Sequence, residues 1–138
     1  MRKPTGEPPV ARKPGNPSAR GGVTASSIGY QPDRGHFVYL DFTPHAGTEQ
    51  AGRRPALILS PLAYNVATGL IFACPMTNQV KGSPFEVALP PNLKVTGVIL
   101  ANQLRSLDWL ARNVTFHSIA PPSVVDEVVA KIDAIIHA

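Results

Sequence analysis

The residues best suited to chemistry lie in a polar, glycine-containing segment just before an apolar run. Residues 47–55 (GTEQAGRRP) place Glu49, Arg53 and Arg54 beside glycines, and the apolar run follows at 56–60. A guanidinium at the mouth of a buried strand can hold a phosphate with two hydrogen bonds and offset developing negative charge. This segment therefore predicts a site for an anionic ligand.

Two further polar clusters follow apolar runs. Residues 75–82 (PMTNQVKG) supply hydroxyl, amide and ammonium groups, and residues 102–109 (NQLRSLDW) supply amides and a guanidinium. None of the three clusters contains a plausible metal quartet or a Ser/His/Asp signature, so no metal or other cofactor is expected. The residues alone thus indicate a small β-rich domain with an arginine-containing polar groove.

Each of these polar residues also has a purely structural interpretation. Arg54 could form a surface ion pair with Glu49, Thr77 could satisfy a turn, and Gln103 could bond the backbone at a strand end. Trp109 belongs to a residue type that is more common in a core than as a base-stacking platform. The histidines share no spacing that marks catalysis, and structural or solvent-facing roles are expected for His36, His45, His117 and His137.

The single cysteine and the absence of long apolar runs restrict the class of protein. Cys74 excludes an intrachain disulfide, fits a reducing compartment and, within an apolar run, is expected to be an inert buried thiol. No apolar run approaches the ~20 residues that span a bilayer. No apolar segment follows the N-terminal basic residues, as it would in a secretory signal. A cytoplasmic protein without a membrane partner is therefore expected.

The formal net charge of +4 lies entirely in the first 28 residues. They carry five basic residues and one acidic residue (5 − 1 = +4), whereas residues 29–138 carry eight of each sign. This segment is rich in proline and glycine and poor in large aliphatic residues. We therefore expect a disordered tail at 1–29 and a folded domain at 30–138. The tail could attract a polyanion or be an inert extension, so bulk charge does not reveal the activity of the domain.

Short β-forming runs must position the polar clusters. At 35–42 the side chains alternate, with Val38, Leu40 and Phe42 on one face, as in a strand. A long connection at 43–54, of a kind that is commonly functional, follows this strand. Pro75 is expected to end the strand at 69–76 or to place it at a sheet edge. The other strands are expected at 56–60, 84–89, 95–101 and 114–119.

Only the C-terminal segment is expected to be helical. Ser123 is expected to cap this helix, and Asp126 and Glu127 to lie in its first turn. Apolar residues then recur every three or four positions and form one stripe, made of Val125, Val128, Val129, Ile132, Ile135 and Ile136. Several short strands and one terminal helix predict a mainly β fold with a C-terminal helix, as a small curved sheet or barrel.

Five short motifs follow one another along the predicted domain. They are GTEQAGRRP at 47–55, LSP with YN at 59–65, PMT at 75–77, KGSPFEV at 81–87 and NQLRSLD at 102–108. In this order and spacing they resemble the MazF/PemK family of toxin endoribonucleases from bacterial toxin–antitoxin modules. The resemblance runs from about Gly35 to the C-terminus, and the segment before Tyr30 lies outside it.

The resemblance implies a fold, an assembly and a reaction. Family members form an SH3-like β-barrel with a terminal helix and act as homodimers with RNA across the dimer face. They cleave single-stranded RNA at short sequence motifs without a metal. The 2′-hydroxyl attacks the adjacent phosphate and leaves a 2′,3′-cyclic phosphate and a 5′-hydroxyl. Because DNA lacks that hydroxyl, DNA should not be cleaved.

The resemblance also implies roles for residues. Arg54 matches the catalytic arginine and would stabilise the phosphorane, and Thr77 matches the catalytic threonine and would donate to a phosphate oxygen. Glu49 matches a loop carboxylate that is a candidate base or RNA contact. The implied RNA-binding residues are Arg53, Asn78, Gln79, Lys81, Asn102, Gln103 and Arg105.

This chain departs from the family at one position. Several members have an aspartate before the glutamine, where this chain has Asn102. An amide cannot act as a general base, so the proton of the attacking hydroxyl must pass to Glu49 or to water here. The choice between them stays open, and activity is still expected because Arg54 and Thr77 are present.

The expected partners follow from a groove that accepts an extended polyanion. Such a groove would also accept the extended acidic tail of a MazE-like antitoxin, as the family implies. Homodimerisation would create two equivalent active sites or one shared groove. RNA attraction must come from local clustering, and a moderate salt dependence is predicted from Arg53, Arg54, Lys81, Arg105 and Arg112.

Two other classes of function remain as alternatives. A non-enzymatic gyrase poison would resemble CcdB, which depends on a Trp-Gly-Ile C-terminus, whereas this chain ends in AIIHA. A catalytically inactive RNA-binding or antitoxin-binding module stays open because of Asn102. Incubation with RNA would separate these alternatives from a ribonuclease.

Overall fold

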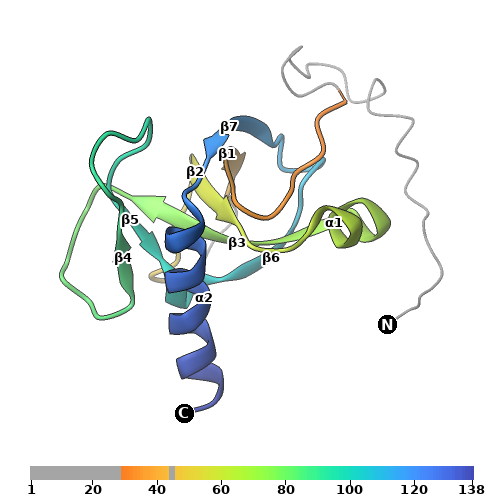
Figure 1. Cartoon of the computed structure of the whole chain (residues 1–138). Coiled ribbons are helices and arrows are strands. Elements are labelled where there is room, and N and C mark those ends of the chain that lie inside the picture. Colours follow the sequence, from red (N-terminus) through yellow and green to blue (C-terminus); the bar gives the residue numbers. More distant parts are fainter. Residues whose placement is uncertain (1–28, 44–45) are drawn as a thin grey trace.

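The computed structural model describes residues 29–43 and 46–138 (Figure 1). The predicted tail, except for Gly29, and His45 lie outside the described residues. Along the chain the elements are β1 (His36–Asp41), β2 (Arg53–Ile58), α1 (Leu62–Thr68), β3 (Leu70–Thr77), β4 (Glu86–Ala88), β5 (Val98–Leu100), the 3₁₀ turn η3 (Ala101–Gln103), β6 (Arg105–Asp108), β7 (Thr115–Ile119) and α2 (Pro122–Ile136).

The seven strands form one antiparallel sheet around the long strand β3. The order is β4-β5-β3-β2-β1-β7, and β6 pairs with the first half of β3. The last two residues of β3 pair with β5 instead, as Met76↔Ile99 and Thr77↔Val98. The predicted mainly β fold with a C-terminal helix is confirmed. An SH3-like barrel is compatible with this order, in which β4 and β7 are the two ends.

Alternating side chains divide the core between the two faces of the sheet. Val38, Leu40 and Phe42 pack with residues of β2, β3 and β6 on one face, as their alternation predicts. Phe37 points to the other face, where α2 covers a second cluster through Val124, Val125 and Val128 (Figure 1). The curved sheet is thus buried on both faces, and the strand ends remain available for polar loops.

Two elements and several strand ends differ from the sequence prediction. β2 spans Arg53–Ile58 and not 56–60, so Arg53 and Arg54 lie in a strand and not in the predicted connection at 43–54. The short helix α1 and the strand β6 were not expected. Pro75 does not end its strand, because β3 continues to Thr77. At Pro75 the neighbour of β3 changes from β6 to β5, and η3 joins those two strands. The missing N–H of proline is tolerated at such a gap in the ladder.

The start of α2 also differs from the prediction. The helix begins at Pro122, with Pro121 at the N-cap position and no side-chain cap. The expectation that Ser123 caps the helix is therefore wrong, and Asp126 and Glu127 lie beyond the first turn. Pro122 explains the early start, because proline fits the first turn of a helix.

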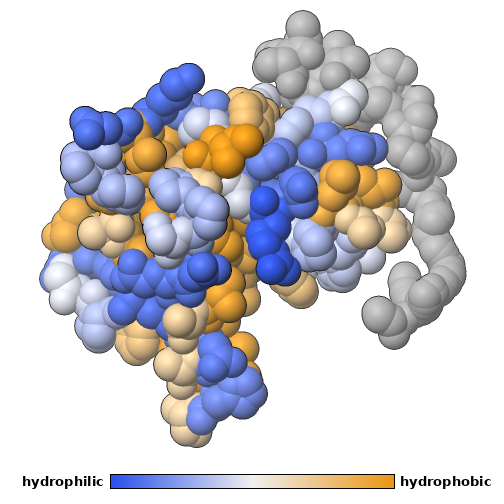
Figure 2. Space-filling view, viewed as in Figure 1, coloured by the Kyte–Doolittle hydropathy of each residue, from blue (hydrophilic) through white to orange (hydrophobic). Residues whose placement is uncertain are grey.

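The apolar stripe of α2 is only partly buried. Its first part packs on the sheet, whereas Val129, Ile135 and Ile136 are exposed. The C-terminal end of α2 extends beyond the sheet (Figure 1), and Figure 2 shows apolar surface exposed on this side of the molecule.

Candidate active site

Strands β2 and β3 bring Arg54 and Thr77 together at one end of the sheet. The two strands run antiparallel with Ala56 opposite Pro75, so Arg54, two residues before Ala56, and Thr77, two residues after Pro75, lie toward the same end of the pair. Arg54 is half-buried, and its Nη1 donates to the carbonyl oxygen of Met76 at 3.1 Å. Its Nε donates to the carbonyl oxygen of Ala51 at 2.9 Å. The guanidinium is thereby fixed beside the end of β3.

The bonds of Arg54 leave donors for a ligand. Two of the five N–H groups of a guanidinium bind backbone carbonyls here. The alternative of a surface ion pair with Glu49 is not found among the described residues, where the Arg54 side chain bonds only those carbonyls. Its remaining N–H groups can therefore meet a phosphate.

Thr77 is held in a way that leaves its hydroxyl hydrogen available. Its Oγ1 accepts the backbone N–H of Gln79 at 3.1 Å, so the hydroxyl can donate elsewhere. The backbone of Gly97 lies so close to Thr77 that a Cβ at Gly97 would be 2.3 Å from the Thr77 carbonyl oxygen. The neighbouring Thr96 donates to Asn78 Oδ1 at 3.0 Å. Thr77 thus has a defined position next to Arg54.

Glu49 lies on an exposed turn that reaches the third polar cluster. Its Oε1 accepts the backbone N–H of Ala46 at 3.1 Å. Gln103 Oε1 accepts the N–H of Gln50 at 3.0 Å, and Gln103 Nε2 donates to the carbonyl oxygen of Thr48 at 3.4 Å. The structure therefore joins the first and third clusters, and Gln103 supports the turn that carries Glu49.

The second cluster continues from Thr77 into an exposed segment. Asn78, Gln79 and Lys81 are all exposed there. The carboxylate of Glu86, at the start of β4, accepts the backbone N–H groups of Lys81 and Gly82. Asn102, in η3, is exposed and therefore accessible to a ligand.

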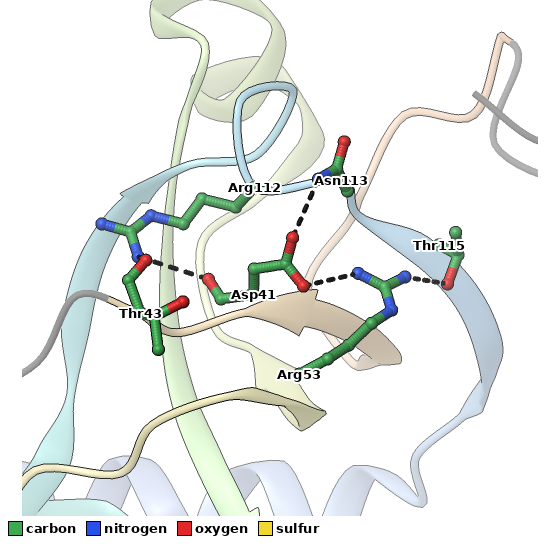
Figure 3. A network of polar contacts seen from close by, with 6 residues as sticks. All are labelled: Asp41, Thr43, Arg53, Arg112, Asn113 and Thr115. Carbon is green, nitrogen blue, oxygen red and sulfur yellow. Dashed lines mark hydrogen bonds and ion pairs between the residues drawn. The ribbon is translucent and has the colours of Figure 1, made fainter. Parts of the chain in front are cut away.

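Arg53 belongs to a polar network with Asp41 and Thr115 (Figure 3), which does not include Arg54. Its Nη1 forms an ion pair with Asp41 Oδ1 at 3.2 Å, and its Nη2 donates to Thr115 Oγ1 at 3.0 Å. Asn113 Nδ2 donates to the second oxygen of Asp41 at 2.8 Å. This separation from Arg54 follows from the strand geometry of β2, in which neighbouring side chains alternate.

Arg105 and Arg112 gather at the end of β1 rather than around Lys81. Arg105 Nη1 donates to the carbonyl oxygen of Phe42 at 3.1 Å, and its guanidinium lies 5.7 Å from the Phe42 ring centre. Arg112 Nη1 donates to the carbonyl oxygen of Thr43 at 2.9 Å (Figure 3). Both arginines brace the start of the connection that carries Glu49, whereas Lys81 follows β3.

The remaining candidates have structural roles. Trp109 is buried and donates from Nε1 to the carbonyl oxygen of Asn65, so its core assignment is confirmed. Burial raises the pKa of the Cys74 thiol to about 12, which fits the expected inert thiol. Burial lowers the pKa of His36, which bonds the Tyr30 hydroxyl. His117 bonds Ser118, and His137 is exposed and bonds Asp133.

Neither a metal site nor a membrane span is found in the described part of the chain. No three His, Cys, Asp or Glu side chains in residues 29–43 and 46–138 are grouped so that they could hold a metal ion. No helix in these ranges is long and apolar enough to cross a membrane.

Three residues that support the site have no assigned role in the sequence prediction, although one of them, Glu86, lies in the motif at 81–87. They are Glu86, Thr96 and Gly97, which contact the segment around Thr77. The KGSPFE spacing places a carboxylate five residues after Lys81, and a glycine interrupts the apolar run at 95–101. Both patterns were visible, but only the fold shows what they contact.

The sequence also matches known proteins over most of the described domain. The family described as the PemK-like, MazF-like toxin of type II toxin–antitoxin systems matches residues 33–136. The chain belongs to this family. The endoribonuclease toxin MazF of Escherichia coli (strain K12) is 44% identical over 107 residues, which cover 78% of this chain and 96% of that toxin.

Solved structures show the same relationship in space. A crystal structure of MazF from Deinococcus radiodurans matches with a TM-score of 0.76 and 54% identity, covering 79% of this chain and 99% of that one. A MazE–MazF crystal structure from the same organism matches with a TM-score of 0.71 and 53% identity, covering 78% and 98% of the two chains. The family resemblance predicted from five motifs is confirmed.

Proposed function

We propose that this protein is the toxin of a type II toxin–antitoxin module and a sequence-selective endoribonuclease of single-stranded RNA. The main structural support for this site is one hydrogen bond. The guanidinium of Arg54 donates to the carbonyl oxygen of Met76, the residue next to Thr77. Membership of the toxin family and similarity to endoribonucleases named MazF support the same function.

The proposed reaction needs only groups that the chain, the RNA and water supply. The 2′-oxygen attacks the phosphorus, a new P–O2′ bond forms and the P–O5′ bond breaks. The remaining N–H groups of Arg54 and the hydroxyl of Thr77 bind the phosphate oxygens, whose negative charge grows in the phosphorane. The proton of the 2′-hydroxyl passes to Glu49 or to water, and the 5′-oxygen takes up a proton from the protonated Glu49 carboxyl or from water. No step requires a metal.

The partners and the division of the chain belong to this proposal. An acidic MazE-like antitoxin would occupy the RNA groove, which agrees with the existence of MazE–MazF structures among its relatives. A homodimer would cover part of the apolar surface that includes Ile135 and Ile136. We place the catalytic domain at 30–138 in the cytoplasm and treat 1–29 as a tail that is dispensable for cleavage.

A cleavage assay with a chelator tests the proposed activity. The protein is incubated with a long unstructured RNA in EDTA, and the ends of the fragments are analysed. The wild type and Arg34→Ala, an exposed arginine far along the chain from the site, should yield 2′,3′-cyclic phosphate and 5′-hydroxyl ends. Arg54→Ala should be inactive although folded, and DNA should stay intact. Intact RNA with folded wild-type protein would refute the proposal.

A further inference from the structure

The segment 78–85 is tied at both ends to elements of the sheet. At its start Thr96 Oγ1 donates to Asn78 Oδ1, next to Thr77. At its end the N–H of Ala101 donates to the carbonyl oxygen of Phe85, and Lys131 Nζ of α2 donates to that of Pro84 at 2.8 Å. Between these ties the segment is open to solvent, with Val80 at 62% exposure. Its shape therefore depends on the contacts made in its middle.

The carboxylate of Glu86 supplies two hydrogen bonds in the middle of the segment, beside the local bonds from Val80 to Asn78 and from Phe85 to Ser83. Its Oε2 accepts the N–H of Lys81, and its Oε1 accepts the N–H of Gly82, both at 3.0 Å. Gly82 has φ +79, a left-handed conformation that favours glycine and turns the chain around the carboxylate. Two consecutive N–H groups binding one anion form a charge-assisted pair of bonds. Glu86 itself is fixed, because it pairs with Leu100 of β5.

Glu86 binds the backbone of Lys81 and not its ammonium group. No ion pair between Lys81 and a carboxylate is found in the described residues. The carboxylate thus fixes the backbone position from which the Lys81 side chain extends. The ammonium group remains available to another anion. Lys81 lies four residues beyond Thr77, so its charge is carried on the segment that leaves the candidate active site.

We propose that Glu86 is a positioning residue, whose carboxylate holds the 78–85 segment so that Lys81 can bind an RNA phosphate next to the cleaved one. This inference rests on the proposed function, since it names RNA as the ligand. Glu86 acts through Lys81 and touches neither the reacting phosphate nor the attacking hydroxyl. It therefore affects RNA affinity and KM, while kcat at Arg54 and Thr77 is largely kept.

The first experiment tests the two hydrogen bonds without RNA. Glu86→Gln keeps the size of the side chain but turns an NH₂ group toward one of the two N–H donors. Amide hydrogen exchange at Lys81 and Gly82 should become at least about tenfold faster in this variant, because a lost charge-assisted bond is worth about 1.4 kcal/mol or more. Glu127→Gln, an exposed carboxylate on α2, removes the same charge and should change neither amide. Unchanged protection in Glu86→Gln would overturn the inference.

The second experiment tests the link to Lys81 with a non-cleavable 2′-O-methyl RNA. Glu86→Gln and Lys81→Ala should each weaken binding about tenfold and reduce the slope of log affinity against log salt by about 0.7, the loss of one phosphate contact on a single strand. The double variant should bind no worse than Lys81→Ala, because both changes remove one contact. Additive losses, or a wild type that does not bind RNA, would overturn the inference.

Cleavage by the same proteins separates this inference from the proposed function. If the wild type and Glu127→Gln cleave RNA and Glu86→Gln raises KM with little change in kcat, both stand. Equal cleavage by Glu86→Gln and Glu127→Gln would refute the positioning role of Glu86, while the proposed ribonuclease function would stand. Non-additive RNA binding without any cleavage would support the role of Glu86 and refute the enzymatic proposal.

Discussion

The side chain of Gln103 accepts the backbone N–H of Gln50 at 3.0 Å, although 53 residues separate them in sequence. The same amide group donates to the carbonyl oxygen of Thr48, so Gln103 contacts the turn on both sides of Glu49. This arrangement makes η3 the support of the turn that carries the candidate base.

Gln103→Leu should therefore lower cleavage by moving the turn. We expect kcat/KM to fall on the order of tenfold, as small misplacements of catalytic groups do, and the free energy of unfolding to fall by about 1 kcal/mol at most. Gln31→Leu, an exposed glutamine outside the site, is the matched control and should leave both unchanged. Single-turnover cleavage and urea unfolding measure the two quantities. Full activity of Gln103→Leu would show that the turn does not depend on this side chain.

Gly97→Ala should damage the site through the backbone of Thr77. Gly97 has φ +101, and a Cβ there would lie 2.3 Å from the Thr77 carbonyl oxygen and 2.8 Å from Asn78 Oδ1. The strained backbone alone costs about 1–3 kcal/mol, and the contact must displace Thr77. Thermal unfolding should show a lower Tm, and cleavage by the folded fraction should fall. Gly29→Ala has a similar positive φ without a close contact, so a similar loss in that variant would contradict the steric explanation.

The strands were largely predictable, because side chains alternate at 35–42 and continuous apolar runs lie at 56–60 and 69–76. Val38, Leu40 and Phe42 share one cluster, as their spacing indicates. The helix α1 was missed because its seven residues form no apolar stripe. Its limits depend on Pro61, on the left-handed Gly69 and on the buried Asn65, which bonds Ser60 and Pro32. Those last contacts exist only in the folded chain.

The resemblance names the expected members of the candidate site, but the sequence did not indicate their hydrogen-bond partners. Motif order predicts that Arg54 and Thr77 belong to one site, and the antiparallel pairing of β2 with β3 places both toward the same end of the two strands. The bonds of Arg53 with Asp41 and Thr115 join three strands, and no spacing in the sequence indicates them. The sequence prediction therefore places Arg53 and Arg54 in one cluster, whereas the alternation of side chains along β2 separates them.

The buried thiol predicts a loss of stability at high pH. Burial raises the pKa of Cys74 from 9.0 to about 12, so the unfolded chain releases this proton at a lower pH than the folded one. Below pH 9.0 the protonated Cys74 thiol therefore contributes fully to the free energy of unfolding. This contribution is lost as the pH rises toward 12, by at most about 1.4 kcal/mol per pH unit.

Urea unfolding at about pH 8 and about pH 10 measures this effect against Cys74→Ala. The wild type should lose about 1 kcal/mol more than the variant over this range. Tyr30, whose pKa is also raised by burial, contributes to both proteins and cancels in the comparison. Equal losses would contradict a thiol that stays protonated in the fold.

The neighbouring residues Arg53 and Arg54 should respond differently to substitution, because they face opposite sides of β2. Arg54→Lys keeps the charge but loses the planar fork and two of the five N–H donors, so it cannot reproduce the geometry of the guanidinium, and kcat should fall on the order of 10²-fold. Arg53→Ala removes an ion pair whose side chains are 39% and 34% exposed, so the free energy of unfolding should fall by about 1 kcal/mol at most. Its effect on cleavage should appear in KM and weaken with added salt. Steady-state kinetics of both variants at low and high salt provide the comparison, and an equal fall in kcat would show that the two guanidiniums serve the same phosphate.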